Sequence, residues 1–270
     1  MDLGIAGRTA IVTGASRGIG AAVARALVSE GVNVVVSARG ADGLASIEEE
    51  LRDAAGAAPR ITAVVGDVYD PATTAALIEA AKGAGPGGGA DILVNNAGSE
   101  SGYLPMERLG DEDWESAYRA NVVGAVRLAT AALAHMRERR WGRIVNVASY
   151  TARVPEPFCG PYAAAKAALV NVTRNFSRSY AGEGVLTNCV LPGLTETEGV
   201  VAGFEAATAA TGRPADDLVA RMLERAPIDV GRMGTSAEVA AGIVFLCSEQ
   251  ASWITGVALP IDGGTIRSAP

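Results

Sequence analysis

The 270-residue sequence is poor in histidine, cysteine and aromatic residues. Its one histidine is His135, and its three cysteines, Cys159, Cys189 and Cys247, lie far apart along the chain. A single histidine excludes a histidine-rich metal site. Three separated cysteines fit reduced thiols better than a disulfide framework or a zinc site. We therefore expect no metal site and no disulfide bond.

Basic residues are outnumbered by acidic ones, and long apolar runs are missing. The 23 Lys and Arg residues against 30 Asp and Glu residues give a net charge of −7, which argues against a nucleic-acid partner. No apolar run approaches the roughly 18 residues of a membrane span. The first residues lack the basic start and apolar stretch of a secretory signal. These absences predict a cytoplasmic protein with no nucleic-acid or membrane partner.

What the sequence does have is a regular alternation of short apolar runs and longer amphipathic segments. We expect strands at 9–13, 33–37, 61–66, 91–95, 143–149, 185–191 and 257–261. We expect helices at 18–30, 43–55, 71–82, 111–137, 162–182 and 235–247. Most of the strands are apolar without strict alternation, as in sheets that are buried on both faces. The pattern predicts a Rossmann-type α/β protein, with a doubly wound, parallel, seven-stranded sheet, helices on both faces and a single domain over residues 1–270.

The segment TGASRGIG, from Thr13 to Gly20, joins the first expected strand to the first expected helix. Glycines let the backbone approach a pyrophosphate closely, and the helix N-terminus offers free N–H groups and the positive end of the helix dipole. The spacing differs from the commoner G-x-G-x-x-G, so a glycine-rich turn without a ligand is the alternative. Its place near the N-terminus, inside a βαβ unit, favours a dinucleotide site.

The end of the second expected strand bears on which dinucleotide binds. NAD sites usually carry Asp or Glu there to hold the ribose 2′-hydroxyl. Here the segment reads VSAR and ends at Arg39, with no carboxylate, while Arg17 lies in the glycine segment. Two guanidinium groups suit a 2′-phosphate. We therefore expect NADP(H), with NAD(H) as the alternative if both arginines are solvated surface residues.

A serine, a tyrosine and a lysine form the candidate catalytic group. Tyr162 and Lys166 are four residues apart, which places them on one face of an expected helix. A neighbouring cation lowers the pKa of a phenol and brings general acid–base work within reach. Ser149 ends an expected strand, at the sheet edge where open α/β folds bind ligands. Without Ser149, the tyrosine and lysine would be no more than an ordinary solvated helix pair.

In this combination the chain resembles the short-chain dehydrogenase/reductase family, in its single-domain branch. The resemblance spans nearly the whole chain, and the motifs follow in the family's order. They are Thr13–Gly20, Asp67-Val68, Asn95-Asn96-Ala97-Gly98, Asn121, Ser149, Tyr162, Lys166, Pro192-Gly193, Thr197, Thr255-Gly256 and Asp262-Gly263-Gly264. In its general pattern the chain resembles the 3-oxoacyl-carrier-protein reductases within that family.

The resemblance implies a mechanism and a set of site residues. Hydride passes between a nicotinamide and a carbonyl carbon while Tyr162, helped by Lys166, gives a proton to the oxygen. Ser149 polarises the carbonyl, and Asn121 holds a water that links the lysine to solvent. The implied cofactor-binding residues are Gly14, Ser16, Arg17, Gly18, Ile19, Gly20, Arg39, Asp67, Val68, Asn95, Ala97, Gly98, Tyr162, Lys166, Pro192, Gly193, Thr195 and Thr197.

The resemblance also indicates where a substrate binds. Residues 199–226 are expected to form helices over the active site, as a substrate lid, and residues 100–103 to form a second substrate loop. Cys159 either touches the substrate or packs locally. Tyr150 follows Ser149 directly, and we expect it to pack away from the site because neighbouring strand residues face opposite ways.

The leading hypothesis is an NADP(H)-dependent enzyme that reduces a ketone or aldehyde of a small molecule to an alcohol, or runs the reverse reaction. The alternatives are an NAD-dependent alcohol or sugar dehydrogenase of the same family and a nucleotide-binding scaffold without catalysis. An acyl-carrier-protein partner would favour basic residues at the entrance, with Arg153 and Arg174 as candidates. The resemblance further implies a homotetramer.

Overall fold

One parallel sheet organises the molecule. The computed structural model describes residues 2–56, 58–98, 104–225 and 227–267. Its main strands are β1 (Thr9–Thr13), β2 (Asn33–Ala38), β3 (Ile61–Val65), β4 (Ile92–Asn95), β5 (Gly142–Val147), β6 (Val185–Pro192) and β9 (Ala258–Ile261). They pair in parallel in the order β3-β2-β1-β4-β5-β6-β9, which confirms the predicted seven-stranded sheet. The order reverses between β1 and β4, and ligands of open α/β sheets bind at such a reversal.

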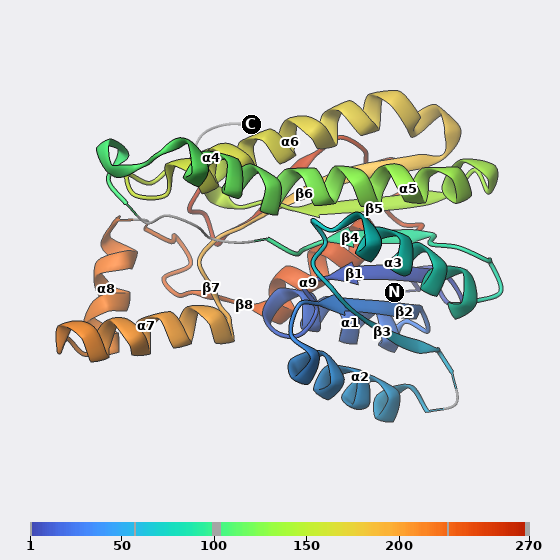
Figure 1. The fold of residues 1–270 in the computed structure, drawn as a ribbon, viewed down its shortest axis with the longest axis horizontal. Coiled ribbons are helices and arrows are strands. Elements are labelled where there is room, and N and C mark those ends of the chain that lie inside the picture. The colour runs from blue at the N-terminus through green and yellow to red at the C-terminus, as the bar shows by residue number, and fades with distance from the viewer. Residues whose placement is uncertain (1, 57, 99–103, 226, 268–270) are drawn as a thin grey trace.

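Helices cover both faces of the sheet, as Figure 1 shows. They are α1 (Gly18–Ser29), α2 (Ala41–Ala55), α3 (Pro71–Ala84), α4 (Asp111–Tyr118), α5 (Gly124–Glu138), α6 (Gly160–Tyr180) and α9 (Ser236–Leu246). Helices α1, α2 and α9 lie on one face, and α3, α4, α5 and α6 lie on the other. The described helices include none that is long and apolar enough to cross a membrane.

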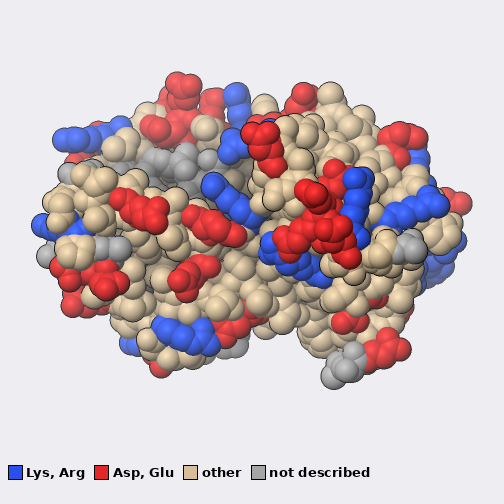
Figure 2. Space-filling model, turned by 90° about the horizontal axis from the view of Figure 1, so that it is seen from below, with Lys and Arg blue, Asp and Glu red and all other residues tan. Residues whose placement is uncertain are grey.

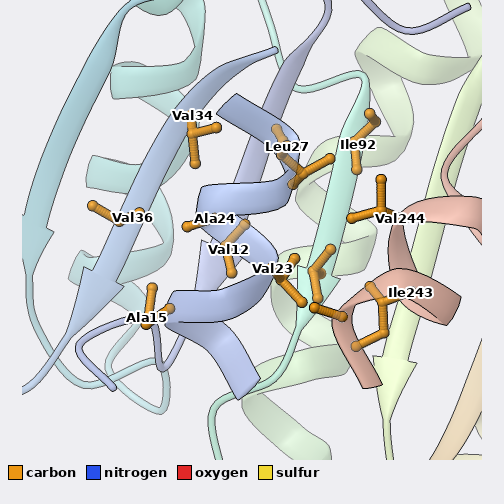
Figure 3. Close-up of a cluster of buried hydrophobic side chains, with 14 of the residues drawn as sticks. Val12, Ala15, Val23, Ala24, Leu27, Val34, Val36, Ile92, Ile243 and Val244 are labelled. Carbon is orange, nitrogen blue, oxygen red and sulfur yellow. The ribbon is translucent and has the colours of Figure 1, made fainter. Parts of the chain in front are cut away.

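Adjacent strand residues are buried on opposite faces, which explains the continuous apolar runs. Val12 is fully buried in a cluster with Leu27 of α1 and Ile243 of α9 (Figure 3). Its neighbour Ile11 is equally buried in a second cluster, with Leu77 of α3 on the other face. Burial on both faces therefore replaces the hydrophobic alternation of a half-exposed strand.

The expected helix 111–137 is divided in two. Helix α4 ends at Tyr118, a π-helical turn follows over Arg119–Val123, and α5 then continues. The side-chain amide of Asn121 donates to the Ala117 carbonyl (2.9 Å), which in a regular α-helix pairs with the backbone N–H of the same residue. Such π turns occur frequently at functional sites.

The expected strand 143–149 ends two residues early. Strand β5 stops at Val147, and Tyr150 begins a 3-10 turn over Tyr150–Ala152. The prediction that Tyr150 packs away from the site used strand alternation, and it fails because this residue lies beyond the strand. Tyr150 is buried, yet it lines the same pocket as Ser149.

Between β6 and α9 the chain forms two very short strands and two helices, and the helices occupy most of residues 199–226, where the family resemblance predicts helices. Strands β7 (Thr195–Glu196) and β8 (Gly234–Thr235) form a separate parallel pair. Between them lie α7 (Glu198–Thr211) and α8 (Ala215–Arg225), on the carboxyl-edge side of the sheet in Figure 1. The Thr197 hydroxyl caps α7 by accepting from the Val200 backbone N–H (3.2 Å).

A buried polar chain connects β4, β5 and α6. The Asn95 amide donates to the Asn146 side-chain oxygen (2.9 Å), and the Asn146 amide donates to the Thr173 hydroxyl (2.9 Å). The Thr173 hydroxyl donates in turn to the Leu169 carbonyl (2.9 Å) within α6. Because buried polar groups must be paired, this chain fixes α6 against the sheet.

We expect Asn146→Ala to lower the free energy of unfolding by about 2 kcal/mol, because the buried groups of Asn95 and Thr173 lose a partner. Urea denaturation measures the loss. The matched control is Asn171→Ala on the exposed surface of α6, where the expected change is within about 0.5 kcal/mol. Equal stability of the two variants would contradict the prediction.

Candidate active site

An open pocket lies at the carboxyl edge of the sheet, next to the reversal of strand order. Its walls come from the glycine segment, from the ends of β2, β4, β5 and β6, and from residues of α4, α6 and α7. The predicted site residues that line it are Gly14, Ser16, Arg17, Gly18, Ile19, Arg39, Asp67, Val68, Ala97, Gly98, Ser149, Tyr162, Lys166, Pro192, Gly193, Thr195 and Thr197. The fold therefore brings together residues from almost the full length of the chain.

Three predicted residues lie behind the pocket wall. Gly20 packs under the glycine segment, where a Cβ atom would come within 2.3 Å of the Gly14 carbonyl oxygen. Asn95 is buried and bonded to Asn146, while its neighbour Asn96 lines the pocket. The third is Asn121, which is buried in the π turn. The predicted strand already ended at Asn95, as β4 does, but Asn95 rather than Asn96 was assigned to the cofactor site.

The glycine segment has the geometry of an anion-binding loop. Gly14 and Gly18 have φ angles of +64° and +59°, in the region that favours glycine. The backbone N–H of Gly18, at the start of α1, donates to the carboxylate of Glu198 (2.8 Å). A carboxylate is an oxyanion, so this bond shows that the helix N-terminus takes one, as the phosphates of a dinucleotide require.

Positive charge lies at the adenine-phosphate end predicted from the sequence. Arg17 and Arg39 both line the pocket, and both are exposed. They stand out because the chain as a whole is acidic, and on the face in Figure 2 carboxylates lie interspersed with basic side chains. Local placement, rather than net charge, decides which ligand this end can accept.

Lys166 is held rigidly beside the candidate tyrosine. Its side chain is 4% exposed, and its ammonium donates to the Val147 carbonyl at the end of β5 (2.9 Å). The ammonium nitrogen lies 5.5 Å from the centre of the Tyr162 ring. The tyrosine and the lysine are thus neighbours on α6, as predicted, and the lysine reaches the end of β5.

Ser149 is oriented by Thr151, which the sequence analysis did not single out. The Ser149 hydroxyl oxygen accepts from the Thr151 backbone N–H (3.2 Å) and from the Thr151 hydroxyl (2.9 Å). A hydroxyl group has two lone pairs and one proton. These two bonds hold the Ser149 hydroxyl in place at the pocket wall.

Gly98 allows the tail of β4 to pass close to the polar groups at the back of the pocket. A Cβ atom there would lie 2.6 Å from the side-chain oxygen of Asn121 and 3.1 Å from the ammonium nitrogen of Lys166. Asn121 and Lys166 therefore stand on the same side of this glycine. The sequence linked the two only through the family resemblance. In the structure Lys166 lines the pocket beside Gly98, and Asn121 lies behind the pocket wall.

The basic residues predicted at the pocket entrance lie outside the pocket lining. Arg153 and Arg174 donate to the carbonyls of Ala258 and Gly256 (3.4 Å each), so they hold the C-terminal strand segment and lie outside the pocket lining. The expected substrate loop 100–103 lies outside the described residues. Within the described part of the chain, no group of three or more His, Cys, Asp or Glu side chains is placed to hold a metal ion.

A glycine loop at the reversal of strand order, with serine, tyrosine and lysine at the same sheet edge, is the arrangement expected of a nucleotide-dependent oxidoreductase. The family model described as short chain dehydrogenase matches residues 8–207. The chain belongs to this family, and it is an enzyme that acts on CH–OH and C=O groups.

Similar proteins span the whole chain. The 3-oxoacyl-[acyl-carrier-protein] reductase FabG of Salmonella typhimurium is 35% identical over 258 residues, covering 96% of this chain and 97% of its own. Cis-4-hydroxycyclohexanecarboxylate dehydrogenase of Sinomonas cyclohexanicum is 38% identical and covers 98% of each chain. L-Sorbose reductase from Gluconobacter frateurii, solved with NADPH and L-sorbose, has a TM-score of 0.92, 34% identity and complete coverage of both chains.

We expect Gly20→Ala to weaken dinucleotide binding about tenfold or more, because its Cβ would overlap the Gly14 carbonyl and displace the loop. Fluorescence titration with NADPH and with NADH measures the effect. Gly83→Ala in α3 is the matched control, since its Cβ would meet nothing within 4 Å. That variant keeps full binding and gains roughly 0.5–1 kcal/mol of stability. Undiminished binding by Gly20→Ala would refute the tight fit of the loop.

Proposed function

We propose that the enzyme uses NADP(H) to reduce the carbonyl group of a small ketone or aldehyde to an alcohol, or to run the reverse oxidation. The observation that carries the proposal is that Ser149, Tyr162 and Lys166 line the same pocket as the glycine loop. When bound there, a nicotinamide supplies or accepts the hydride. The protein's own part is to hold the carbonyl and to move one proton.

In this mechanism Ser149 and Tyr162 both act on the carbonyl oxygen of the substrate. Ser149 donates its hydroxyl proton as a hydrogen bond, an orientation supported by the two bonds that it accepts from Thr151. Tyr162 transfers its phenolic proton to the oxygen as negative charge develops there. In the oxidative direction the phenolate takes the proton back.

Lys166 and Asn121 replace the proton that Tyr162 gives up. The Lys166 ammonium, fixed by the Val147 carbonyl, favours the phenolate electrostatically. Asn121 lies behind Gly98, on the same side as the ammonium, where its amide is suited to hold a water on a path to solvent. The division of α4 from α5 by the π turn supports this role, because it is the turn that carries Asn121.

NADP(H), rather than NAD(H), fits the charge at the end of β2. Arg17 and Arg39 line that end of the pocket, and no carboxylate stands among residues 36–39. Planar guanidinium groups bind phosphate oxygens with paired hydrogen bonds. A neutral ribose hydroxyl would gain much less from the same two residues.

Residues 199–226 fit the part of a substrate lid within a single domain of 1–270. Gly199 and Val200, in the first turn of α7, line the pocket together with Thr197. Assembly as a homotetramer stays an expectation from the family resemblance.

We expect Tyr162→Phe to lower kcat by about 10²–10⁴-fold while NADPH binding is kept, because only the proton donor is lost. Steady-state reduction of a ketone panel and NADPH fluorescence titration measure the two quantities. Tyr180→Phe, at the far end of the same helix, is the matched control and keeps full turnover. Retained turnover in the Tyr162 variant would remove this residue from the proposed role.

We expect Arg39→Asp to shift the ratio of kcat/KM for NADPH over NADH by about ten- to hundredfold toward NADH. The reason is that a charge-assisted phosphate contact is replaced by repulsion. Arg178→Asp, an exposed residue of α6 outside the pocket, controls for the change of net charge. An unchanged ratio for the Arg39 variant would favour an enzyme that prefers NAD(H).

A further inference from the structure

Glu156 lies between the two segments that carry the proposed catalytic residues. It is half-buried and lines the same pocket as Ser149 and Tyr162. The Cys159 backbone N–H, which directly precedes α6, donates to the Glu156 carbonyl oxygen (3.2 Å). The loop therefore keeps Glu156 close to the start of the helix on which Tyr162 stands.

A neighbour of Ser149 fixes the Glu156 carboxylate. The phenol of Tyr150 donates to Oε1 of Glu156 across the loop. Tyr150 is buried and follows Ser149 directly, so the carboxylate is held relative to the serine. This bond engages one carboxylate oxygen, Oε1, of a residue that lines the pocket.

A fixed carboxylate in a substrate pocket discriminates by charge and by hydrogen-bond type. An ionised carboxylate only accepts hydrogen bonds, and bonds to it are stronger than those between neutral groups. A substrate hydroxyl can donate to it, a methyl group cannot, and a substrate carboxylate or phosphate is repelled. Sites built to bond a hydroxyl reject analogues that lack it, because the buried polar group then loses its partner.

The other charged side chains nearby do not cancel this preference. Of the pocket cations on this side, Lys166 is bound to the Val147 carbonyl, and Arg119 lies 3.3 Å from the carboxylate of Glu115. Arg153 is a near neighbour in sequence, but it donates to the Ala258 carbonyl and lies outside the lining.

We propose that Glu156, held by Tyr150, is a specificity-determining residue that accepts a hydrogen bond from a substrate hydroxyl near the carbonyl. The substrates are then neutral hydroxylated ketones or aldehydes, in preference to unsubstituted or anionic ones. This proposal rests on the proposed carbonyl reduction, and it adds the substrate class.

The test compares kcat/KM for acetone, hydroxyacetone and pyruvate, three ketones of equal carbon number, in the wild type and in Glu156→Gln. Glutamine can still accept the Tyr150 bond but carries no charge, so the loop keeps its anchor. We expect the preference for hydroxyacetone over acetone to fall about tenfold in the variant. We expect pyruvate to gain relative to acetone, because repulsion is removed. A purely structural role would lower all three rates together.

Two further variants sharpen the result. Tyr150→Phe keeps the charge but releases the carboxylate, so the hydroxyacetone preference falls while pyruvate gains nothing. Glu107→Gln, an exposed carboxylate outside the pocket, leaves all three ratios unchanged. Thermal melting of each variant verifies that the fold is kept.

Each outcome decides the matter. Turnover of acetone or pyruvate by the wild type without preference for hydroxyacetone overturns the substrate class and leaves carbonyl reduction standing. Equal ratios in wild type and Glu156→Gln overturn the role of Glu156. No turnover of any of the three with NADPH or NADH counts against the proposed reduction itself, and the substrate class falls with it.

Discussion

Hydrogen bonds between the ends of β1 and β4 hold the two halves of the pocket together. The Asn96 amide donates to the carbonyls of Thr13 and Gly14 (3.0 Å each). The Thr13 hydroxyl accepts from the backbone N–H groups of Asn96 (3.1 Å) and Ala97 (3.0 Å). These bonds sit at the reversal of strand order, where the sheet itself leaves a crevice. Through Gly98 the same tail reaches Asn121 and Lys166, so the glycine segment and these two polar residues share one support.

The sheet could be predicted because each strand is recognised from its own run of apolar residues. Ile11 and Val12 are buried on opposite faces, and a continuous apolar run of this kind predicts a strand that is covered on both sides. The π turn could not be predicted, since the helical periodicity of 111–137 continues through it. What breaks the helix is the Asn121 amide taking the Ala117 carbonyl, a competition that propensities do not encode. The two-residue strands β7 and β8 are likewise too short to leave a pattern.

The pocket was predictable to the extent that its residues end strands or start helices. Parallel strands bring their carboxyl ends to one edge, so Gly14, Ser149 and Pro192 had to meet there once the strands were placed. Contacts that depend on the path of a loop could not be predicted from the sequence pattern in this way. The Tyr150–Glu156 bond joins residues six apart in an irregular segment, and only its fold shows that both line the pocket.

An acidic chain can still bind an anion, because the attraction comes from groups within a few ångströms of the site. The backbone N–H of Gly18 binds an oxyanion whatever the net charge, because its attraction comes from the helix end and acts over a few ångströms. Its partner is Glu198, 180 residues later, the first residue of α7. Because this carboxylate bonds the glycine loop directly, a displacement of α7 away from the loop must break the bond. The glycine loop near the start of the chain and α7 near its end are therefore joined directly at the pocket.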